Sequence, residues 1–175
     1  MAMSIVRYCN YLTALSVALF VQVLALAQLR KKDGLLDVTR FYPESFDRIL
    51  LDPPCSALGL RPKLFVTQTT LDDLKYFASN QRCFARQAVA LLKPGGIMTY
   101  STCTIHGFEN EAMVRHVLDE YPIMELLPID INLGLPGLGG FGLDERECSF
   151  VRRFDPADKK ADTMGFFIAK FQKKI

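Results

Sequence analysis

One aspartate and two cysteines stand in two short motifs, each directly after an apolar run. The motifs are Asp-Pro-Pro-Cys at residues 52–55 and Ser-Thr-Cys-Thr at residues 101–104. A helical stretch and a Pro-Gly-Gly turn separate them. Strand, helix and strand in this order predict parallel neighbours, and ligands of open α/β sheets bind at the carboxyl ends of the strands. We therefore expect Asp52, Cys55 and Cys103 to share one crevice.

The paired prolines of the first motif restrict what this crevice can recognise. Pro53 and Pro54 fix their backbone torsions and remove two N–H donors, so the Pro53 carbonyl is a rigid acceptor suited to an exocyclic amine. The carboxylate of Asp52 can then reach a ring nitrogen. Cysteine at position 55, in place of an aromatic residue that would stack on a base, favours a ring carbon as the acceptor. The plainer alternative is an ordinary strand exit with a buried structural cysteine.

Cys103 is the better candidate for a nucleophile, because it lies between a strand and the N-terminus of the next predicted helix, where positive partial charge lowers the pKa of a thiol. A thiolate that adds to C6 of cytosine makes the ring an enamine, whose C5 can attack an electrophilic methyl group. An acid at N3 assists the addition, and a base must remove the C5 proton. Cys103, Asp52 and Cys55 can fill these three roles. A thiol–disulfide function for the cysteine pair is an alternative, but the two do not form a Cys-x-x-Cys motif.

The remaining pattern from residue 33 onward is that of an α/β protein. Apolar runs and helical spacing predict strands over 46–52, 97–101, 123–127 and 165–171, helices over 71–92 and 108–120, and a glycine-rich loop over 134–142. Strands that alternate with helices indicate a parallel-rich, doubly wound sheet.

Residues 11–29 differ from the rest because they carry no charge. Their length is that of a marginal membrane-spanning helix. A signal sequence, a buried helix and a foreign start to the chain are the alternatives. We therefore expect two parts, a hydrophobic N-terminal segment over 1–32 that could contact a membrane, and an α/β part over 33–175.

Composition adds a few limits. The net charge is +2 and half of the residues are hydrophobic, which excludes a disordered chain. The five cysteines fit neither a disulfide framework nor zinc spacing, so we expect reduced thiols, a cytoplasmic or nuclear setting and no metal site. Basic residues cluster at several points, among them Arg82 and Arg86, and a solvated surface is the plain interpretation.

Taken together, these motifs resemble the two-cysteine RNA cytosine-5 methyltransferases of the NSUN, or Sun-type, family. The resemblance covers roughly residues 41–175, and the pieces that carry it are residues 46–59, 81–82, 92–96, 100–105, 109–111, 153–156 and 165–171. Residues 60–62 and 165–171 are most similar to the branch of the sixth NSUN member, which acts on tRNA near the acceptor end.

The resemblance implies a role for each of the three site residues. Cys103 is the covalent nucleophile, Cys55 assists release of the methylated base, and Asp52 contacts the cytosine and lies beside the methyl donor, S-adenosylmethionine. It also implies an RNA substrate, tRNA in the most similar branch, and a cytoplasmic or nuclear location.

The sequence departs from the family at its start. The family's donor site has a glycine-rich loop and a lysine after the first strand, then an acid after each of the next two strands. The first two features are absent, and Asp37 is a candidate for the third. We therefore expect the later strands of a Rossmann-like, S-adenosylmethionine-dependent methyltransferase sheet, preceded by a hydrophobic helix, with most of the donor site missing. The alternative is a truncated, non-catalytic family member that is membrane-tethered.

Overall fold

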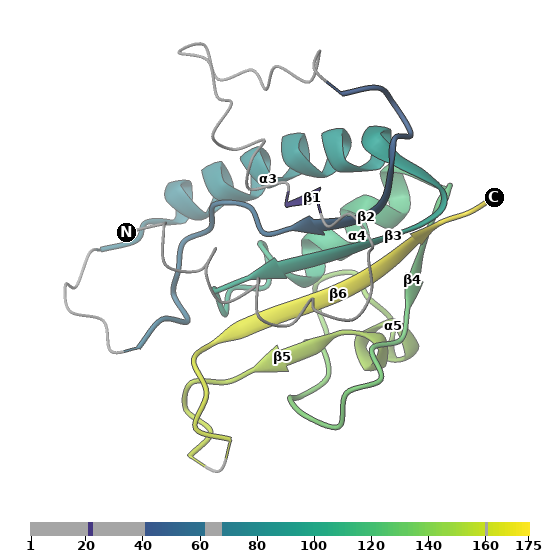
Figure 1. Cartoon of the computed structure of the whole chain (residues 1–175). Helices are drawn as coiled ribbons and strands as arrows, with labels where there is room; N and C mark the ends of the chain where they lie inside the picture. Colours follow the sequence, from purple (N-terminus) through teal and green to yellow (C-terminus); the bar gives the residue numbers. More distant parts are fainter. Residues whose placement is uncertain (1–20, 23–40, 62–67, 160) are drawn as a thin grey trace.

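A six-stranded mixed sheet organises the computed structural model, which describes residues 21–22, 41–61, 68–159 and 161–175. Its strand order is β1-β2-β3-β6-β4, with β5 paired to β6 beside this path (Figure 1). The first three strands are parallel, and β6 runs antiparallel to both β3 and β4. The strands are β1 (Val21–Gln22), β2 (Phe46–Leu51), β3 (Leu92–Thr102), β4 (Met124–Leu127), β5 (Arg152–Phe154) and β6 (Phe166–Lys173), and the helices are α3 (Leu71–Leu91), α4 (Glu111–Glu120) and α5 (Glu145–Phe150).

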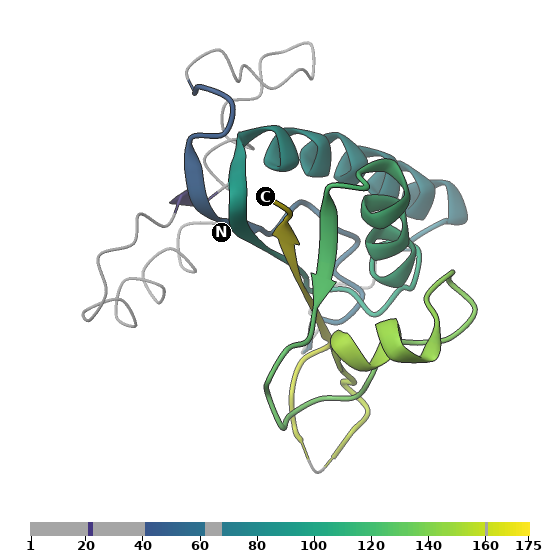
Figure 2. The ribbon, with the colours of Figure 1, turned by 90° about the vertical axis from the view of Figure 1, so that its right-hand side faces the viewer.

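The two longer helices, α3 and α4, lie on the same side of the sheet (Figure 2). A capping box starts α3: the Thr70 hydroxyl accepts from the backbone N–H of Asp73, and the Asp73 carboxylate accepts from the N–H of Thr70. In β6, alternate residues are buried, and Phe167, Ala169 and Phe171 are wholly inaccessible to solvent. The sheet therefore buries a continuous apolar face against the helices.

The C-terminus of α3 is capped by a lysine from a distant strand. The helix has no basic residue in its own last turn. The buried ammonium of Lys173, in β6, donates to the carbonyls of Val89 and Leu92 at 3.2 and 2.8 Å, and to the carboxylate of Glu44 at 2.8 Å. Lys173 thus satisfies carbonyls that the helix leaves without partners, and its charge is favourable at this end of the helix.

Most of the predicted elements are confirmed. The helices predicted over 71–92 and 108–120 are α3 and α4, and the four predicted strands are β2, β3, β4 and β6. The pattern missed the short elements α5 and β5 and the extension of β3 back to Leu92 through the Pro-Gly-Gly turn. The glycine-rich stretch 134–142 is a loop, as predicted, apart from one bridge between Leu135 and Arg153.

The N-terminal segment requires a correction. Val21 and Gln22 form a strand that pairs in parallel with Ile49 and Leu50 of β2, so the hydrophobic helix predicted over 11–29 is wrong at these two residues. The rest of that segment lies outside the described residues. A strand of a parallel sheet, buried on both faces, also has an uninterrupted apolar sequence, which periodicity alone does not separate from a buried helix. Among the residues the structure describes, no helix is long and apolar enough to cross a membrane.

Replacing Lys173 tests the cap on α3. The variant Lys173→Met keeps the length of the side chain but leaves buried carbonyls of α3 without a donor. We expect the free energy of unfolding to fall by about 1–3 kcal/mol in urea melts followed by circular dichroism. The neighbouring Lys174→Met, which removes an exposed ammonium, is the control and should change stability by less than about 0.5 kcal/mol. Equal stability of the two variants would contradict the capping role.

Candidate active site

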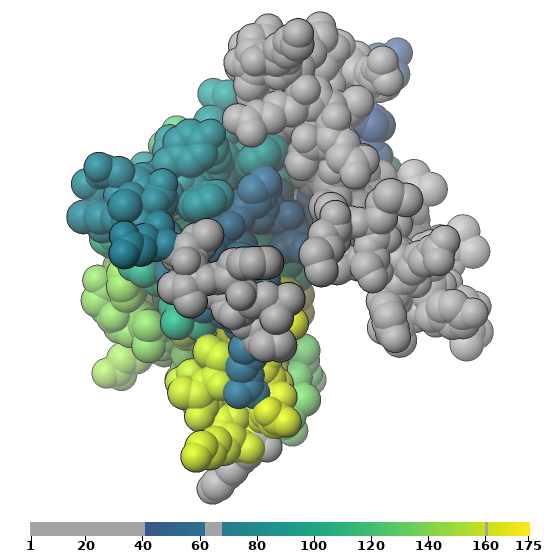
Figure 3. All heavy atoms as spheres, turned by 90° about the vertical axis from the view of Figure 1, so that its left-hand side faces the viewer, coloured from purple at the N-terminus to yellow at the C-terminus, as the bar shows by residue number. Residues whose placement is uncertain are grey.

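The two cysteine motifs meet at the carboxyl ends of β2 and β3. These strands are parallel neighbours with Leu51 opposite Tyr100, so the segments that follow them leave the sheet side by side. The Sγ atoms of Cys55 and Cys103 lie 3.3 Å apart, and both residues are partly buried. Figure 3 views the molecule from this end, where the start of α3 and the residues before β6 also lie. The structure therefore brings the two predicted thiols together.

The thiol pair is electrostatically asymmetric. The hydrogen bond from the Cys55 thiol lowers the pKa of Cys103, although burial opposes this shift. The same hydrogen bond, together with burial, raises the pKa of Cys55 well above its ordinary value. Of the two thiols, Cys103 is thus the one that ionises first, and its thiolate then accepts a hydrogen bond from the protonated Cys55. Cys103 is the thiol prepared for nucleophilic attack.

Asp52 ends the strand that leads to Cys55. Burial raises the pKa of its carboxyl, and a hydrogen bond with the Ser101 side chain partly offsets this rise. Its negative charge opposes ionisation of Cys103, which places the carboxylate within electrostatic reach of that thiol. A carboxyl with a raised pKa holds a proton more readily, which suits hydrogen-bond donation to a ring nitrogen.

A buried carboxylate, to which the sequence assigned no role, holds the first motif in place. Glu109 is inaccessible to solvent and accepts from the backbone N–H of Ser56 at 2.9 Å, from its hydroxyl, and from the Gln81 amide at 3.0 Å. The same amide donates to the carbonyl of Pro54 at 3.1 Å. Glu109 and Gln81 therefore fix the backbone on both sides of Cys55.

Asn110 holds the second motif in the same way. Its side-chain oxygen accepts from the Thr102 hydroxyl at 2.6 Å, and its amide donates to the Thr104 carbonyl at 3.0 Å. The hydroxyls of Thr104 and Ser56, 2.8 Å apart, join the two motifs directly. The residues on either side of Cys103 are thus clamped by one side chain.

Backbone conformation between Cys55 and Gly59 is tightly constrained. The N–H of Gly59 donates to the Cys103 carbonyl at 3.0 Å, and the Gly59 carbonyl accepts from Gly165 at 2.7 Å. A Cβ atom on Gly59 would overlap the backbone of Gly165, so this close approach requires glycine. Ala57 has φ of +54°, a left-handed conformation that is unfavourable for a residue with a side chain.

The two histidines of the chain and its glycine-rich stretch lie outside both cysteine motifs. His106 contacts the ring of Phe108, and His116 lies within α4. The glycines of 134–142 belong to the long loop that joins β4 to α5, and not to a short turn that opens a βαβ unit. No group of three potential metal ligands occurs in the described part of the chain.

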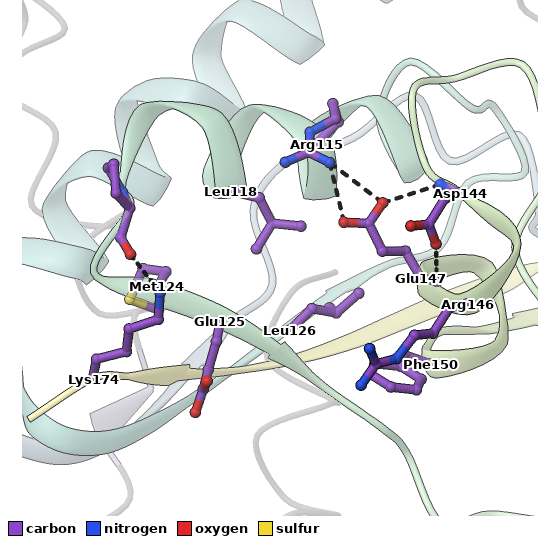
Figure 4. A pocket seen from close by; sticks show the side chains of 11 residues that line it. Arg115, Leu118, Met124, Glu125, Leu126, Asp144, Arg146, Glu147, Phe150 and Lys174 are labelled. Carbon is purple, nitrogen blue, oxygen red and sulfur yellow. Dashed lines mark hydrogen bonds and ion pairs between the residues drawn. The ribbon is translucent and has the colours of Figure 1, made fainter.

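A hollow of about 450 Å³ lies between α4, α5 and the edge strand β4 (Figure 4). The ion pair between Arg115 and Glu147 lies above it, with nitrogen and oxygen 3.1 Å apart. None of its lining residues belongs to either cysteine motif, and we assign this hollow no part in the chemistry.

Among the residues that the structure describes, Asp52 is a candidate for a position beside a methyl donor. It directly follows the parallel strand β2 and lies within electrostatic reach of Cys103. The other donor contacts expected from the resemblance, Asp37 included, fall before Phe41 and lie outside the described residues. The expectation that most of the donor site is missing from the chain therefore stays a prediction.

A mixed sheet with helices packed against it, and a pair of thiols at the carboxyl ends of its parallel strands, defines the class as α/β proteins of the Rossmann-like type. The model of the family described as 16S rRNA methyltransferase RsmB/F matches residues 15–172, and the chain belongs to this family. The match begins inside the apolar segment 11–29, for which a foreign start is one of the alternatives, so the family likeness extends into that segment.

Curated relatives carry related names. The chain is 48% identical over 141 residues to the rRNA (cytosine-C(5))-methyltransferase NOP2C of Arabidopsis thaliana, a match that covers 75% of the chain and 23% of the relative. It is 38% identical to the tRNA (cytosine(72)-C(5))-methyltransferase NSUN6 of Homo sapiens, over 76% of the chain and 33% of the relative. The crystal structure of NSun6 from Pyrococcus horikoshii with SFG is similar with a TM-score of 0.64 and 40% identity, over 74% of the chain and 30% of that protein. The chain thus spans a third or less of the length of these relatives.

Alkylation rates test the asymmetry of the thiols. We expect iodoacetamide at pH 7.5 to modify Cys103 faster than Cys55, because the thiolate is the reactive form. Cys55→Ala removes the hydrogen-bond donor that lowers the pKa of Cys103, so the rate at Cys103 should fall severalfold, whereas Cys55→Ser keeps a donor and should preserve it. Peptide mass spectrometry gives the rates, with the exposed Cys83 as internal reference. Faster labelling of Cys55 would contradict the assignment.

The strained backbone at position 57 gives a separate prediction. Ala57→Gly should raise the free energy of unfolding by about 0.5–1 kcal/mol, because glycine adopts positive φ without the steric cost that alanine bears. Urea melts measure the change. Ala78→Gly, at a buried position inside α3, is the control and should lower stability by about 1 kcal/mol or more. Destabilisation by Ala57→Gly would show that the left-handed conformation is absent in solution.

Proposed function

We propose that the chain carries the cytosine-binding and nucleophilic half of an S-adenosylmethionine-dependent RNA cytosine-5 methyltransferase. The observation that supports this most directly is the contact of 3.3 Å between the Cys55 and Cys103 sulfurs, with Asp52 at the end of the adjoining strand. One thiolate, one protonated thiol and one carboxyl are the groups that methylation at C5 of a pyrimidine requires. The relatives are named as cytosine-5 methyltransferases of rRNA and of tRNA. The likeness of residues 60–62 and 165–171 to the tRNA branch favours tRNA as the substrate.

The reaction begins when the Cys103 thiolate adds to C6 of the cytosine. The carboxyl of Asp52 donates its proton towards N3, which accepts the electron density that the addition displaces into the ring. S-adenosylmethionine, when bound, supplies the methyl group that C5 receives, and Asp52 is the described residue that would lie beside it.

Release of the product needs a base at C5. Cys55 is protonated at first because its thiol donates to the Cys103 thiolate. Once the Cys103 sulfur is bonded to C6 it carries no charge, so that reason for the raised pKa of Cys55 disappears. Cys55 can then lose its proton to solvent, remove the C5 proton as a thiolate, and allow the C6–S bond to break. The two sulfurs therefore act in turn.

Single-residue variants separate these roles. With a tRNA transcript and S-adenosylmethionine labelled in the methyl group, Cys103→Ala should reduce transfer at least 10³-fold, because no covalent intermediate forms. Cys55→Ala should instead accumulate a protein–RNA adduct that survives a denaturing gel, because release requires Cys55. The double variant Cys55→Ala/Cys103→Ala should show no adduct, and Cys83→Ala should behave as the unaltered protein.

Calorimetric titration of the full chain with S-adenosylmethionine decides between the enzyme and its alternative. Saturable binding together with Cys103-dependent transfer supports the proposal. A folded chain that neither binds the donor nor transfers methyl groups would instead be the truncated, non-catalytic family member. The resemblance to RNA-modifying enzymes favours a cytoplasmic or nuclear location. Membrane association through residues 11–29 stays a prediction that co-sedimentation with vesicles tests.

A further inference from the structure

A hollow of about 310 Å³ lies between α3 and the start of α4, close to the cysteine motifs. It is lined by Lys75, Ala78, Ser79, Arg82, Phe108 and Ala112. Because both helices follow strands whose carboxyl ends carry the motifs, this hollow opens at the catalytic end of the sheet. Its volume is at the lower end of the range for small-molecule sites and suits one nucleotide.

Two hydrogen-bonded connections join the hollow to the first cysteine motif. Gln81, next to Arg82 on α3, donates to the carbonyl of Pro54. Glu109, next to Phe108, accepts from Ser56. Two residues that line the hollow, Arg82 and Phe108, therefore have sequence neighbours that contact the backbone on either side of Cys55. If the target nucleotide of an RNA lies at Cys103, a neighbouring nucleotide of the same strand can lie in this hollow.

The cations of the hollow form a line along the helix. Lys75, Ser79 and Arg82 line the hollow, and Arg86 lies one turn further along α3. Their spacings of four, three and four residues place these four exposed side chains on one face of the helix. Lys75 has an exposed ion pair with Asp72 at 3.6 Å, a contact too weak to neutralise it. Burial lowers the pKa of His116, and Arg82 lies near enough to lower it further. The carboxylates of Glu120 and Asp119 oppose this shift only in part.

An aromatic side chain completes the hollow. Phe108 is 39% exposed although it is large and apolar. Its ring meets the edge of Phe141, with centroids 5.9 Å apart, and tilts against His106 at 5.0 Å, so the ring is held in a fixed orientation. Single-stranded nucleic acid is recognised by cations that follow the phosphates and by aromatic rings that stack on the bases. This hollow supplies both, and its lining residues Arg82 and Phe108 directly adjoin Gln81 and Glu109, which contact the first cysteine motif.

From these observations we propose that this hollow, which forms a groove between α3 and Phe108, binds the single-stranded nucleotide that adjoins the target cytosine. The phosphates lie along Lys75 and Arg82, and the base stacks on Phe108. This inference rests on the proposed function, since it names a contact of the same RNA. A solvated basic face would explain the charges but not the fixed, exposed aromatic ring beside them.

The test measures RNA affinity of the full chain as a function of salt, with a fluorescent single-stranded 12-nucleotide RNA that has one central cytosine. Lys75→Gln/Arg82→Gln should weaken binding about tenfold and reduce the slope of log K against log salt by about 1.4, as expected for two phosphate contacts on a single strand. Phe108→Ala should weaken binding about tenfold with the slope unchanged. The matched control, Lys93→Gln/Arg146→Gln, removes the same charge from β3's amino end and from α5, and should leave both values near those of the unaltered protein.

Photocrosslinking adds a positional readout. A 4-thiouridine next to the cytosine should crosslink to the peptide that contains Phe108, and the double variant should lose this crosslink while its thermal melt stays unchanged. The groove assignment would be overturned if Lys75→Gln/Arg82→Gln and the control Lys93→Gln/Arg146→Gln bound the RNA with equal affinity and equal salt slope. Cys103-dependent methyl transfer is scored separately: transfer without an effect of the groove variants overturns the groove alone, whereas groove effects without transfer overturn the proposed function alone.

Discussion

The site depends on three consecutive polar residues at the start of α4, all of them inaccessible to solvent. Glu109, Asn110 and Glu111 have 0% exposure, although each has a polar side chain whose burial is costly without partners. Each residue finds its partners in a different segment. Glu109 holds the backbone around Cys55, and Asn110 holds the threonines on both sides of Cys103. The relative position of the two sulfurs is therefore set by adjacent residues of one turn.

Glu111 connects this turn to the far side of the fold. Its carboxylate forms a buried ion pair with Arg153 of β5 at 2.7 and 2.8 Å and accepts from the N–H of Leu138 at 2.9 Å. Arg153 also donates to the carbonyl of Ile105, two residues after Cys103. A buried ion pair contributes little net stability compared with an apolar pair, but loss of one partner leaves an uncompensated charge. This geometry therefore enforces a single arrangement of the loop after Cys103.

Sequence patterns located the reactive residues because these are local features. The two cysteine motifs follow apolar runs, and parallel pairing of two such runs is enough to bring Cys55 and Cys103 together. The residues that hold them were beyond a local pattern. Gln81 lies 28 residues before Glu109 and on another helix, so only the packing of α3 against α4 makes them partners. The three residues of β5 and the six of α5 are similarly too short for periodicity to detect. The helix predicted over the apolar segment is wrong at Val21 and Gln22 for a different reason. A buried parallel strand and a buried helix have the same apolar composition, so the pattern does not separate them.

The turn before α4, which contains Glu109 and Asn110, also explains how substrate binding and chemistry can be linked. Phe108 precedes Glu109 directly, so a ring that stacks on a base is covalently joined to the carboxylate that positions Ser56 and, through it, Cys55. Gln81 makes the corresponding connection from α3, because it lies beside Arg82 and donates to both Pro54 and Glu109. Binding energy gained in the groove acts on residues that adjoin the reactive sulfurs, where correct orientation has the largest effect on rate. A rigid buried turn transmits this orientation better than a loop could, because none of its polar groups can exchange its partner for water.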